Sequence, residues 1–218
     1  MLVTKESARE LILGSFSTQF LKGLTVIAYE ATKRSREIAC EDQFSDHVRP
    51  HMAGQNRWGL IESLLLPLVE STPDVIGEKA KNATGSSTHY EVRSGRCILT
   101  VAASRNRAIP KKAVYRLDLS QSNQLSLFDK NDADSDSPIY VVLNFGSCGS
   151  CRSKENLNDM PEWILLQVPD VKFRHAIAEV SLKELFPDVV AKYEQKTAEE
   201  SIPVARTTPK RNVAISEG

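Results

Sequence analysis

The strongest strand signal in this chain of 218 residues is the run Ile139-Tyr140-Val141-Val142-Leu143-Asn144-Phe145. It consists mainly of β-branched and aromatic residues and directly follows a turn-forming Pro138. Upstream, Lys112–Leu119 alternates polar and apolar residues, which is the period-2 pattern of a half-buried strand. We therefore predict two strands of one sheet at 139–145 and 112–119, with the intervening residues as a connection.

Three further segments have strand character. Tyr90–Arg93 and Cys97–Ala103 flank the turn-forming pair Ser94-Gly95, which predicts a hairpin. Trp163–Val168 is an apolar run that ends at Pro169-Asp170, and Val180–Leu185 reads as either a short helix or an edge element. Five strands following one another along the chain indicate a mostly antiparallel sheet.

The first third of the chain has helical periodicity instead. Apolar residues recur at helical spacing from about Lys5 to Ala39, a segment that we expect to bend near Gly14 or Gly23. A second helix is expected to follow Gln55–Trp58 and to end near Pro73. The prediction is therefore an α+β fold, in which N-terminal helices pack on a mostly antiparallel sheet of about five strands.

The predicted domain organisation has three parts. Residues 1–80 form a helical part, and residues 85–190 form an antiparallel β-rich part that belongs to the same domain. Residues 191–218 are charged and poor in aromatic residues, so we expect a flexible, disordered C-terminal tail.

Composition limits the function classes only weakly. Lys plus Arg and Asp plus Glu both total 28, so the net charge gives no argument for nucleic acid or membrane. The N-terminus lacks the pattern of a signal peptide, and no window approaches the ~20 apolar residues of a membrane-spanning helix. We expect a cytoplasmic protein whose four cysteines are free thiols: Cys40, Cys97, Cys148 and Cys151.

The local charge distribution is uneven. Seven basic residues and no acidic one lie between Arg93 and Arg116, whereas Asp118–Asp136 holds five aspartates against Lys130 alone. Basic loops can neutralise DNA phosphates, although a solvated hairpin face has the same composition. The candidate DNA-binding residues are Arg93, Arg96, Arg105, Arg107, Lys111, Lys112 and Arg116.

Apolar residues also occur where a connection between strands would not need them, in the pentapeptide Gln124-Leu125-Ser126-Leu127-Phe128. This segment closely resembles the peptide by which bacterial replication and repair proteins dock on the DNA polymerase sliding clamp. All five positions fit the preferred form of that peptide.

The resemblance implies a role for each residue of the pentapeptide. Gln124 would hydrogen-bond at the rim of the clamp pocket, Leu125 would lie along a side groove, and Leu127 with Phe128 would fill the apolar subsite; Ser126 completes the motif. The resemblance covers five residues of 218 and so implies a partner rather than a family. The alternative is a short strand that folds back on the sheet and buries Leu125 and Leu127 together.

Two enzymatic alternatives remain open. Cys148-Gly149-Ser150-Cys151 follows a predicted strand and is similar to the redox pair of thioredoxin-type oxidoreductases, although the segment between strand and first cysteine is shorter than in that family. A clamp-targeted nuclease would need clustered carboxylates, for which Asp170-Val171-Lys172 and Glu91 with Asp118 are the available fragments. His47 and His51 are the only histidines at ligand spacing, and Pro50 lies between them.

We therefore expect a bacterial or phage protein without enzymatic activity that associates with DNA through the sliding clamp. The basic hairpin is expected to touch the DNA backbone. No cofactor, metal ion or membrane is expected, and the sequence leaves the oligomeric state open.

Overall fold

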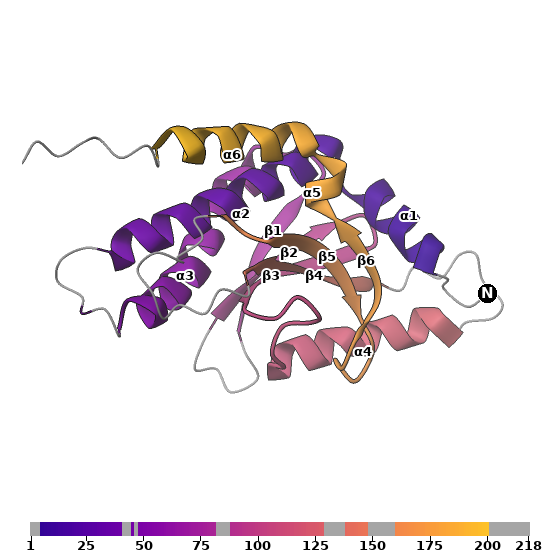
Figure 1. Cartoon of the computed structure of the whole chain (residues 1–218). Helices are drawn as coiled ribbons and strands as arrows, with labels where there is room; N and C mark the ends of the chain where they lie inside the picture. The colour runs from indigo at the N-terminus through magenta and orange to yellow at the C-terminus, as the bar shows by residue number, and fades with distance from the viewer. Residues whose placement is uncertain are drawn as a thin grey trace, which may run out of the picture.

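The computed structural model describes residues 5–40, 45, 48–81, 88–128, 138–147 and 160–200. Within these ranges, side chains are described everywhere except at 5–7, 49–50, 124–128 and 196–200. The fold is α+β, as predicted, with helices around a six-stranded, mostly antiparallel sheet (Figure 1).

Two N-terminal helices replace the single bent helix that the sequence predicts. α1 (Lys5–Ser15) and α2 (Thr18–Ala39) meet at an angle of 93°. The side chain of Ser17 caps α2 by accepting a hydrogen bond from the backbone N–H of Phe20 at 3.2 Å. The break lies between Ser15 and Thr18, so the predicted bend near Gly14 is confirmed, whereas α2 continues through Gly23.

α3 (Arg49–Glu70) packs closely against α2. It begins earlier than predicted, with proline in its first turn, where the missing N–H costs no helical hydrogen bond. At the crossing, a Cβ atom added to Gly23 would lie 2.4 Å from Cδ1 of Leu68. The absence of a side chain at Gly23 therefore allows the close approach of the two helices.

The six strands lie in the sheet in their order along the chain. They are β1 (Ile76–Lys81), β2 (Thr88–Ser94), β3 (Cys97–Ser104), β4 (Ile139–Gly146), β5 (Trp163–Pro169) and β6 (Ala176–Ser181). β3 and β4 pair in parallel, and the other neighbours are antiparallel. The predicted hairpin and the strands at 139–145 and 163–168 are confirmed, while β1 lies inside the segment predicted to be helical.

The strand predicted at Lys112–Leu119 is wrong, because this segment belongs to the helix α4 (Val114–Phe128). A parallel pair such as β3 and β4 requires a crossover connection, and α4 supplies it. The side of α4 that faces the sheet carries the polar residues Arg116, Ser120 and Asn123 at positions i, i+4 and i+7, and its two apolar contacts, Leu117 and Leu119, are not at helical spacing. A search for apolar helical periodicity therefore could not find this helix.

Two elements complete the C-terminal part. α5 (Leu182–Leu185) follows β6 directly, so the segment 180–185 combines the end of an edge strand with a short helix. α6 (Pro187–Glu200) packs along α2, where the rings of Tyr29 and Tyr193 stack at 4.8 Å. The first ten residues of the predicted tail at 191–218 are therefore helical, and residues 201–218 lie outside the described part of the chain.

The sheet separates two hydrophobic clusters. The larger one joins α1, α2 and α3 to one face of the sheet and includes Phe20, Leu24, Ile61, Leu65 and Val141. The smaller one lies on the opposite face, below α4, and contains Ile98, Ala102, Tyr140, Val142 and Phe173. Figure 1 shows α4 alone across the sheet from α2 and α6.

Candidate functional site

The pentapeptide Gln124–Phe128 forms the last five residues of α4. This corrects both sequence-based interpretations of its backbone, since the segment is neither a loop nor a strand that folds back on the sheet. Its side chains lie outside the described set. The motif is therefore located as the C-terminal end of a crossover helix, directly before residues 129–137, which the structure does not describe.

Asn123, the residue before the motif, fastens α4 to the sheet. Its side-chain amide donates to the carbonyls of Tyr140 at 3.2 Å and Pro169 at 2.9 Å, and its Oδ1 accepts from the backbone N–H of Tyr140 at 2.7 Å. Asn123 is 2% exposed. One turn earlier, the hydroxyl of Ser120 donates to the carbonyl of Val171 at 3.2 Å. Asn123 is therefore a point of attachment of α4 to the sheet, directly before the motif.

The seven candidate DNA-binding residues do not form one stripe. Arg96 lies in the turn before β3, and Arg105 and Arg107 follow the other end of this strand. β3 has eight residues, a length of about 23 Å at roughly 3.3 Å per residue. Lys111 and Lys112 are exposed on the loop that leads into α4.

Three arginines among the seven candidate residues have contacts within the protein that suggest a structural role: Arg93, Arg107 and Arg116. Arg93 pairs with Glu91 at 2.9 Å, and Arg107 lies 3.7 Å from Glu179. Arg116 donates to the carbonyls of Lys111 at 3.0 Å and Val101 at 3.2 Å. The exposed basic residues of the 105–112 loop are thus better placed to meet a phosphate backbone than Arg93 or Arg116.

β2 and β3 pair over part of their length, and a cluster of polar side chains lies beyond the paired residues. No sequence pattern indicated this cluster. The register between these strands covers three residue pairs, from Ser94–Cys97 to Val92–Leu99. Further along, the carbonyl of Val101 accepts from the guanidinium of Arg116. An α4 side chain therefore supplies a hydrogen bond to this part of β3.

Glu91 is the centre of this cluster. Its carboxylate lies 3.0 Å from Nε2 of His89 and 2.9 Å from Nη2 of Arg93, and the ring of His89 stacks on Tyr115 at 3.7 Å. On β2, His89, Glu91 and Arg93 alternate with residues of the larger core, so one strand joins an apolar face to a polar one. The period-2 spacing is visible in the sequence, but the contact with Tyr115 depends on α4, which sequence patterns missed.

Glu62 of α3 lies near the same polar cluster. Burial raises the pKa of its carboxyl group, while a hydrogen bond from the backbone N–H of Tyr90 and the charges of Lys79 and Arg116 oppose the shift. Glu62 therefore connects the helical layer electrostatically to α4.

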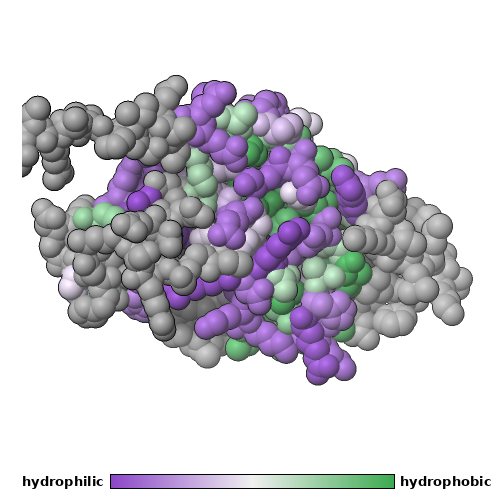
Figure 2. Space-filling view, in the orientation of Figure 1, coloured by the Kyte–Doolittle hydropathy of each residue, from purple (hydrophilic) through white to green (hydrophobic). Residues whose placement is uncertain are grey.

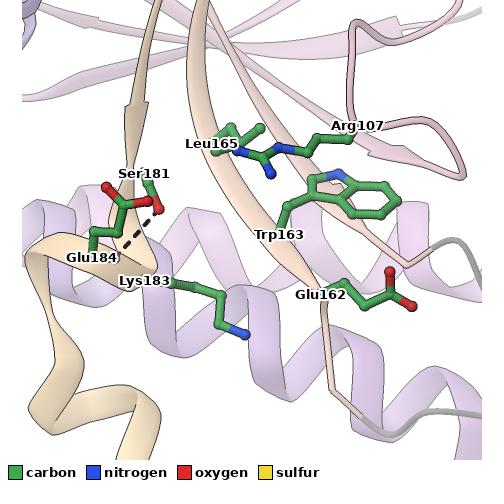
Figure 3. A pocket seen from close by; sticks show the side chains of 7 residues that line it. All are labelled: Arg107, Glu162, Trp163, Leu165, Ser181, Lys183 and Glu184. Atoms are coloured by element: carbon green, nitrogen blue, oxygen red, sulfur yellow. Dashed lines mark hydrogen bonds between the residues drawn. The ribbon is translucent and has the colours of Figure 1, made fainter.

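A pocket of about 410 Å³ lies on β5 and β6 (Figure 3). Its lining residues are Arg107, Glu162, Trp163, Leu165, Ser181, Lys183 and Glu184. Beside it, the buried side chains of Asn144 and Gln167 bond to each other at 3.0 Å, and the indole N–H of Trp163 donates to Oδ1 of Asn144 at 3.4 Å. No sequence pattern indicates this pocket, because its residues come from three separate stretches of the chain, at 107, 162–165 and 181–184.

The enzymatic alternatives gain no assembled site among the described residues. Cys148 and Cys151 lie outside the described part of the chain, while Cys97 is buried and Cys40 is exposed. Burial raises the pKa of the Cys97 thiol, although Ser15 and Arg96 oppose the shift. The structure describes no group of three or more His, Cys, Asp or Glu side chains arranged to hold a metal ion.

The carboxylate fragments considered for a nuclease are also separate. Asp170 lies in the turn between β5 and β6, where it accepts hydrogen bonds from the backbone N–H groups of Arg174 and His175. Burial opposes these bonds, but together with the charge of His175 they lower the pKa of Asp170. Asp170 thus organises a turn, whereas Glu91 lies on β2 and Asp118 is exposed on α4.

Comparison with family models, curated proteins and solved structures finds no match for this chain. Among the described residues, no single helix combines the length and apolar character of a membrane crossing, although the bent pair α1 and α2 reaches this criterion when counted together.

Proposed function

We propose that this protein is a non-enzymatic accessory or regulatory factor that docks on the bacterial DNA polymerase sliding clamp through Gln124–Phe128. The observation that carries the proposal is the pentapeptide itself, in which each of five consecutive positions fits the clamp-binding peptide. Leu127 and Phe128 are the apolar anchors of the interaction. Burial of each would contribute about 1.5–3 kcal/mol, which the ordering of the segment partly offsets.

The position of the motif in α4 supports this proposal. The last four carbonyls of a helix have no partner within the helix, so its end opens at lower cost than its interior. Asn123 holds the preceding turn through three hydrogen bonds and stays in place when the end opens. In the proposed docking, Gln124–Phe128 leaves the helix while Asn123 and the turn before it stay on the sheet.

Opening is a requirement of docking. Neighbouring residues in an α-helix are separated by about 100° around its axis, whereas Leu127 and Phe128 must enter one apolar subsite. The bound form therefore needs a more extended backbone after Asn123. Conversion of this helix end lowers the net affinity, and we expect a dissociation constant in the micromolar range, on the order of 1–10 μM.

A contact with DNA is a narrower part of the proposal. The exposed loop residues Arg105, Lys111 and Lys112 precede α4 and could meet the phosphate backbone near the clamp. Each such contact would contribute to affinity without reading sequence. Arg93 and Arg116 are assigned structural roles by their contacts with Glu91 and the Val101 carbonyl.

The test is competition for a purified bacterial sliding clamp, read by the fluorescence polarisation of a labelled Gln124–Phe128 peptide. The wild-type protein should displace the peptide, and the double variant Leu127→Ala/Phe128→Ala should bind at least about 100-fold more weakly. Val114→Ala is the matched control, because this apolar residue is 58% exposed at the other end of α4.

Thermal unfolding of the same variants separates docking from folding. An unchanged melting temperature of the double variant, together with lost competition, supports the proposal. Undiminished competition by the double variant contradicts it, as does a labelled peptide that fails to bind the clamp. A large fall in melting temperature would assign Leu127 and Phe128 to the core, and binding of the isolated peptide would then decide whether the motif itself is recognised.

A further inference from the structure

The pocket on β5 and β6 is a separate feature from the clamp motif. Trp163 and Leu165 form its apolar floor on β5 and alternate along the strand with Ile164 and Leu166, which belong to the larger core. Both floor residues are nearly buried, with exposures of 5% and 1%. This strand therefore fills the core with one face and lines a pocket with the other.

The loop that supplies Arg107 is held by a buried amide network. Asn144 and Gln167 both donate to the carbonyl of Arg107 at 3.1 Å, and Gln167 also donates to the carbonyl of Ala108 at 2.7 Å. Asn144 and Gln167 are fully buried. Buried amides are costly unless they are paired, and this pair fixes the loop and, through Trp163, the indole ring. The backbone beneath the pocket is thus preorganised.

The rim carries two charges of each sign. Arg107 and Lys183 are cationic, and Glu162 and Glu184 are anionic. Figure 3 shows both cationic groups to the left of the Trp163 indole, with the ammonium group of Lys183 lower in the view than the guanidinium of Arg107. Arg107 has one long ion pair with Glu179, at 3.7 Å with both side chains partly exposed, which is weak enough to exchange for a ligand carboxylate.

We infer that this pocket binds a small zwitterion, namely a free amino acid or a dipeptide with both termini free. Arg107 would bind the carboxylate through its planar pair of N–H donors, and Glu162 and Glu184 would attract the ammonium group. The apolar side chain would lie on Trp163 and Leu165. A pocket of about 410 Å³ is within the range of small-ligand sites, roughly 300–1,000 Å³.

The charge pattern favours this class over single-charge ligands. A polyanion such as a nucleotide would meet the two glutamates, and a polyamine would meet Arg107 and Lys183. A zwitterion carries one charge of each sign, so it can pair with both the cationic and the anionic side chains of the rim. Figure 2 shows hydrophilic side chains over much of the described surface on the side of the molecule in view, in keeping with recognition by charge and hydrogen bonding.

The experiment uses the intrinsic fluorescence of Trp163. The chain has two tryptophans, and Trp58 is 43% exposed, so Trp58→Phe leaves Trp163 as the single reporter. The probes are the dipeptide Leu-Leu and its blocked form, N-acetyl-Leu-Leu-amide, which keeps the side chains but lacks both terminal charges. We expect a saturable change with Leu-Leu, and none with the blocked form.

Two variants in the Trp58→Phe background test the assigned contacts. Arg107→Ala should weaken Leu-Leu binding by about 10- to 100-fold, because it removes a charge-assisted pair of hydrogen bonds. Arg34→Ala is the control, since it removes a partly exposed arginine that pairs with Glu30 on α2, and it should bind as the parent does. Saturation-transfer NMR gives a second readout that does not depend on the indole.

The outcomes separate the ligand classes. Absence of a saturable response to Leu-Leu in both readouts would overturn the inference, as would equal responses to the free and blocked dipeptides. A response to glucose or dAMP without one to Leu-Leu would replace the zwitterion by a sugar or a nucleotide. Clamp competition is measured independently, so either proposal can fail without the other.

Discussion

α2 and α4 dock on opposite faces of the same sheet by different means. The buried face of α2 is mainly apolar and contributes Phe20, Leu21 and Leu24 to the larger core. The buried side of α4 instead includes Arg116, Ser120 and Asn123, each of which donates to a backbone carbonyl of the sheet or its turns, while Leu117 and Leu119 pack on the smaller core. The first helix is held chiefly by burial of apolar area, whereas the second combines hydrogen bonds with a smaller apolar contact.

The two mechanisms have different consequences. Burial of apolar area is non-directional and tolerates small shifts, whereas hydrogen bonds fix the position of a helix and become costly when one partner is removed. α4 is therefore held at defined points, and among the residues whose side chains are described Asn123 is the last of them. The proposed docking requires the pentapeptide end of α4 to change conformation independently of the core.

The largest loss of stability is expected from a change in α2, the helix that is held chiefly by apolar burial. Phe20→Ala should lower the free energy of unfolding by about 4 kcal/mol, since this fully buried ring packs against Phe16 at 5.4 Å and its loss leaves a cavity. Urea denaturation measures the change. Leu66→Ala on α3 is the control, because Leu66 is 40% exposed and should cost less than about 1 kcal/mol. Equal losses for the two variants would show that burial does not determine stability here.

The helices of the apolar side were predictable from the sequence for the same reason. Leu11, Phe20, Leu24 and Ile27 recur at helical spacing, and the bend was expected at a glycine, which favours helix interruption. Strand β4 was predictable because its residues are almost all apolar and it is buried on both faces. Burial of apolar side chains can therefore be recognised in the sequence as a pattern of apolar residues.

The elements that dock through polar side chains or are mostly exposed show no such pattern of apolar residues. α4 was mistaken for a strand because Val114, Leu117 and Leu119 stand among polar residues, while the positions that dock the helix are Arg, Ser and Asn. β1 was missed because its side chains are mostly exposed and include Gly77 and three charged residues. The pocket around Trp163 is lined by Arg107 and Lys183, which are far apart in the sequence, so no local pattern indicates it.

A smaller loss is expected when the polar docking is broken. Asn123→Ala removes three hydrogen bonds to Tyr140 and Pro169 and leaves buried backbone groups unpaired, which should cost about 2–3 kcal/mol. Hydrogen exchange should become faster in α4 while α2 keeps its protection.

The matched control for this change is Ser122→Ala. The hydroxyl of Ser122 donates to the carbonyl of Leu119 at 2.7 Å, a bond within α4 itself, so its removal should leave both helices protected. If Asn123→Ala accelerated exchange in α2 as much as in α4, the two faces would unfold as one unit. The proposed independence of the α4 end would then be wrong.

The smallest effect on stability is expected from Glu62 of α3, whose carboxyl group interacts electrostatically with Arg116 of α4. Burial raises the pKa of this carboxyl group in the folded protein, so the folded state holds its proton at a pH where the unfolded chain has released it. The contribution of Glu62 to stability is therefore most favourable below the unfolded pKa and declines as the pH rises through the interval up to the folded value.

Glu62→Gln cannot ionise and keeps an oxygen for the N–H of Tyr90. Relative to this variant, the wild type should lose melting temperature as the pH rises from about 4.3, where its unfolded carboxyl titrates, to the higher pKa of the folded state. Glu30→Gln is the control, since Glu30 is a partly exposed carboxylate on α2. A wild-type protein that instead gains stability relative to Glu62→Gln over this interval would show that the charges of Arg116 and Lys79 outweigh burial, and that α4 stabilises the ionised carboxylate from across the sheet.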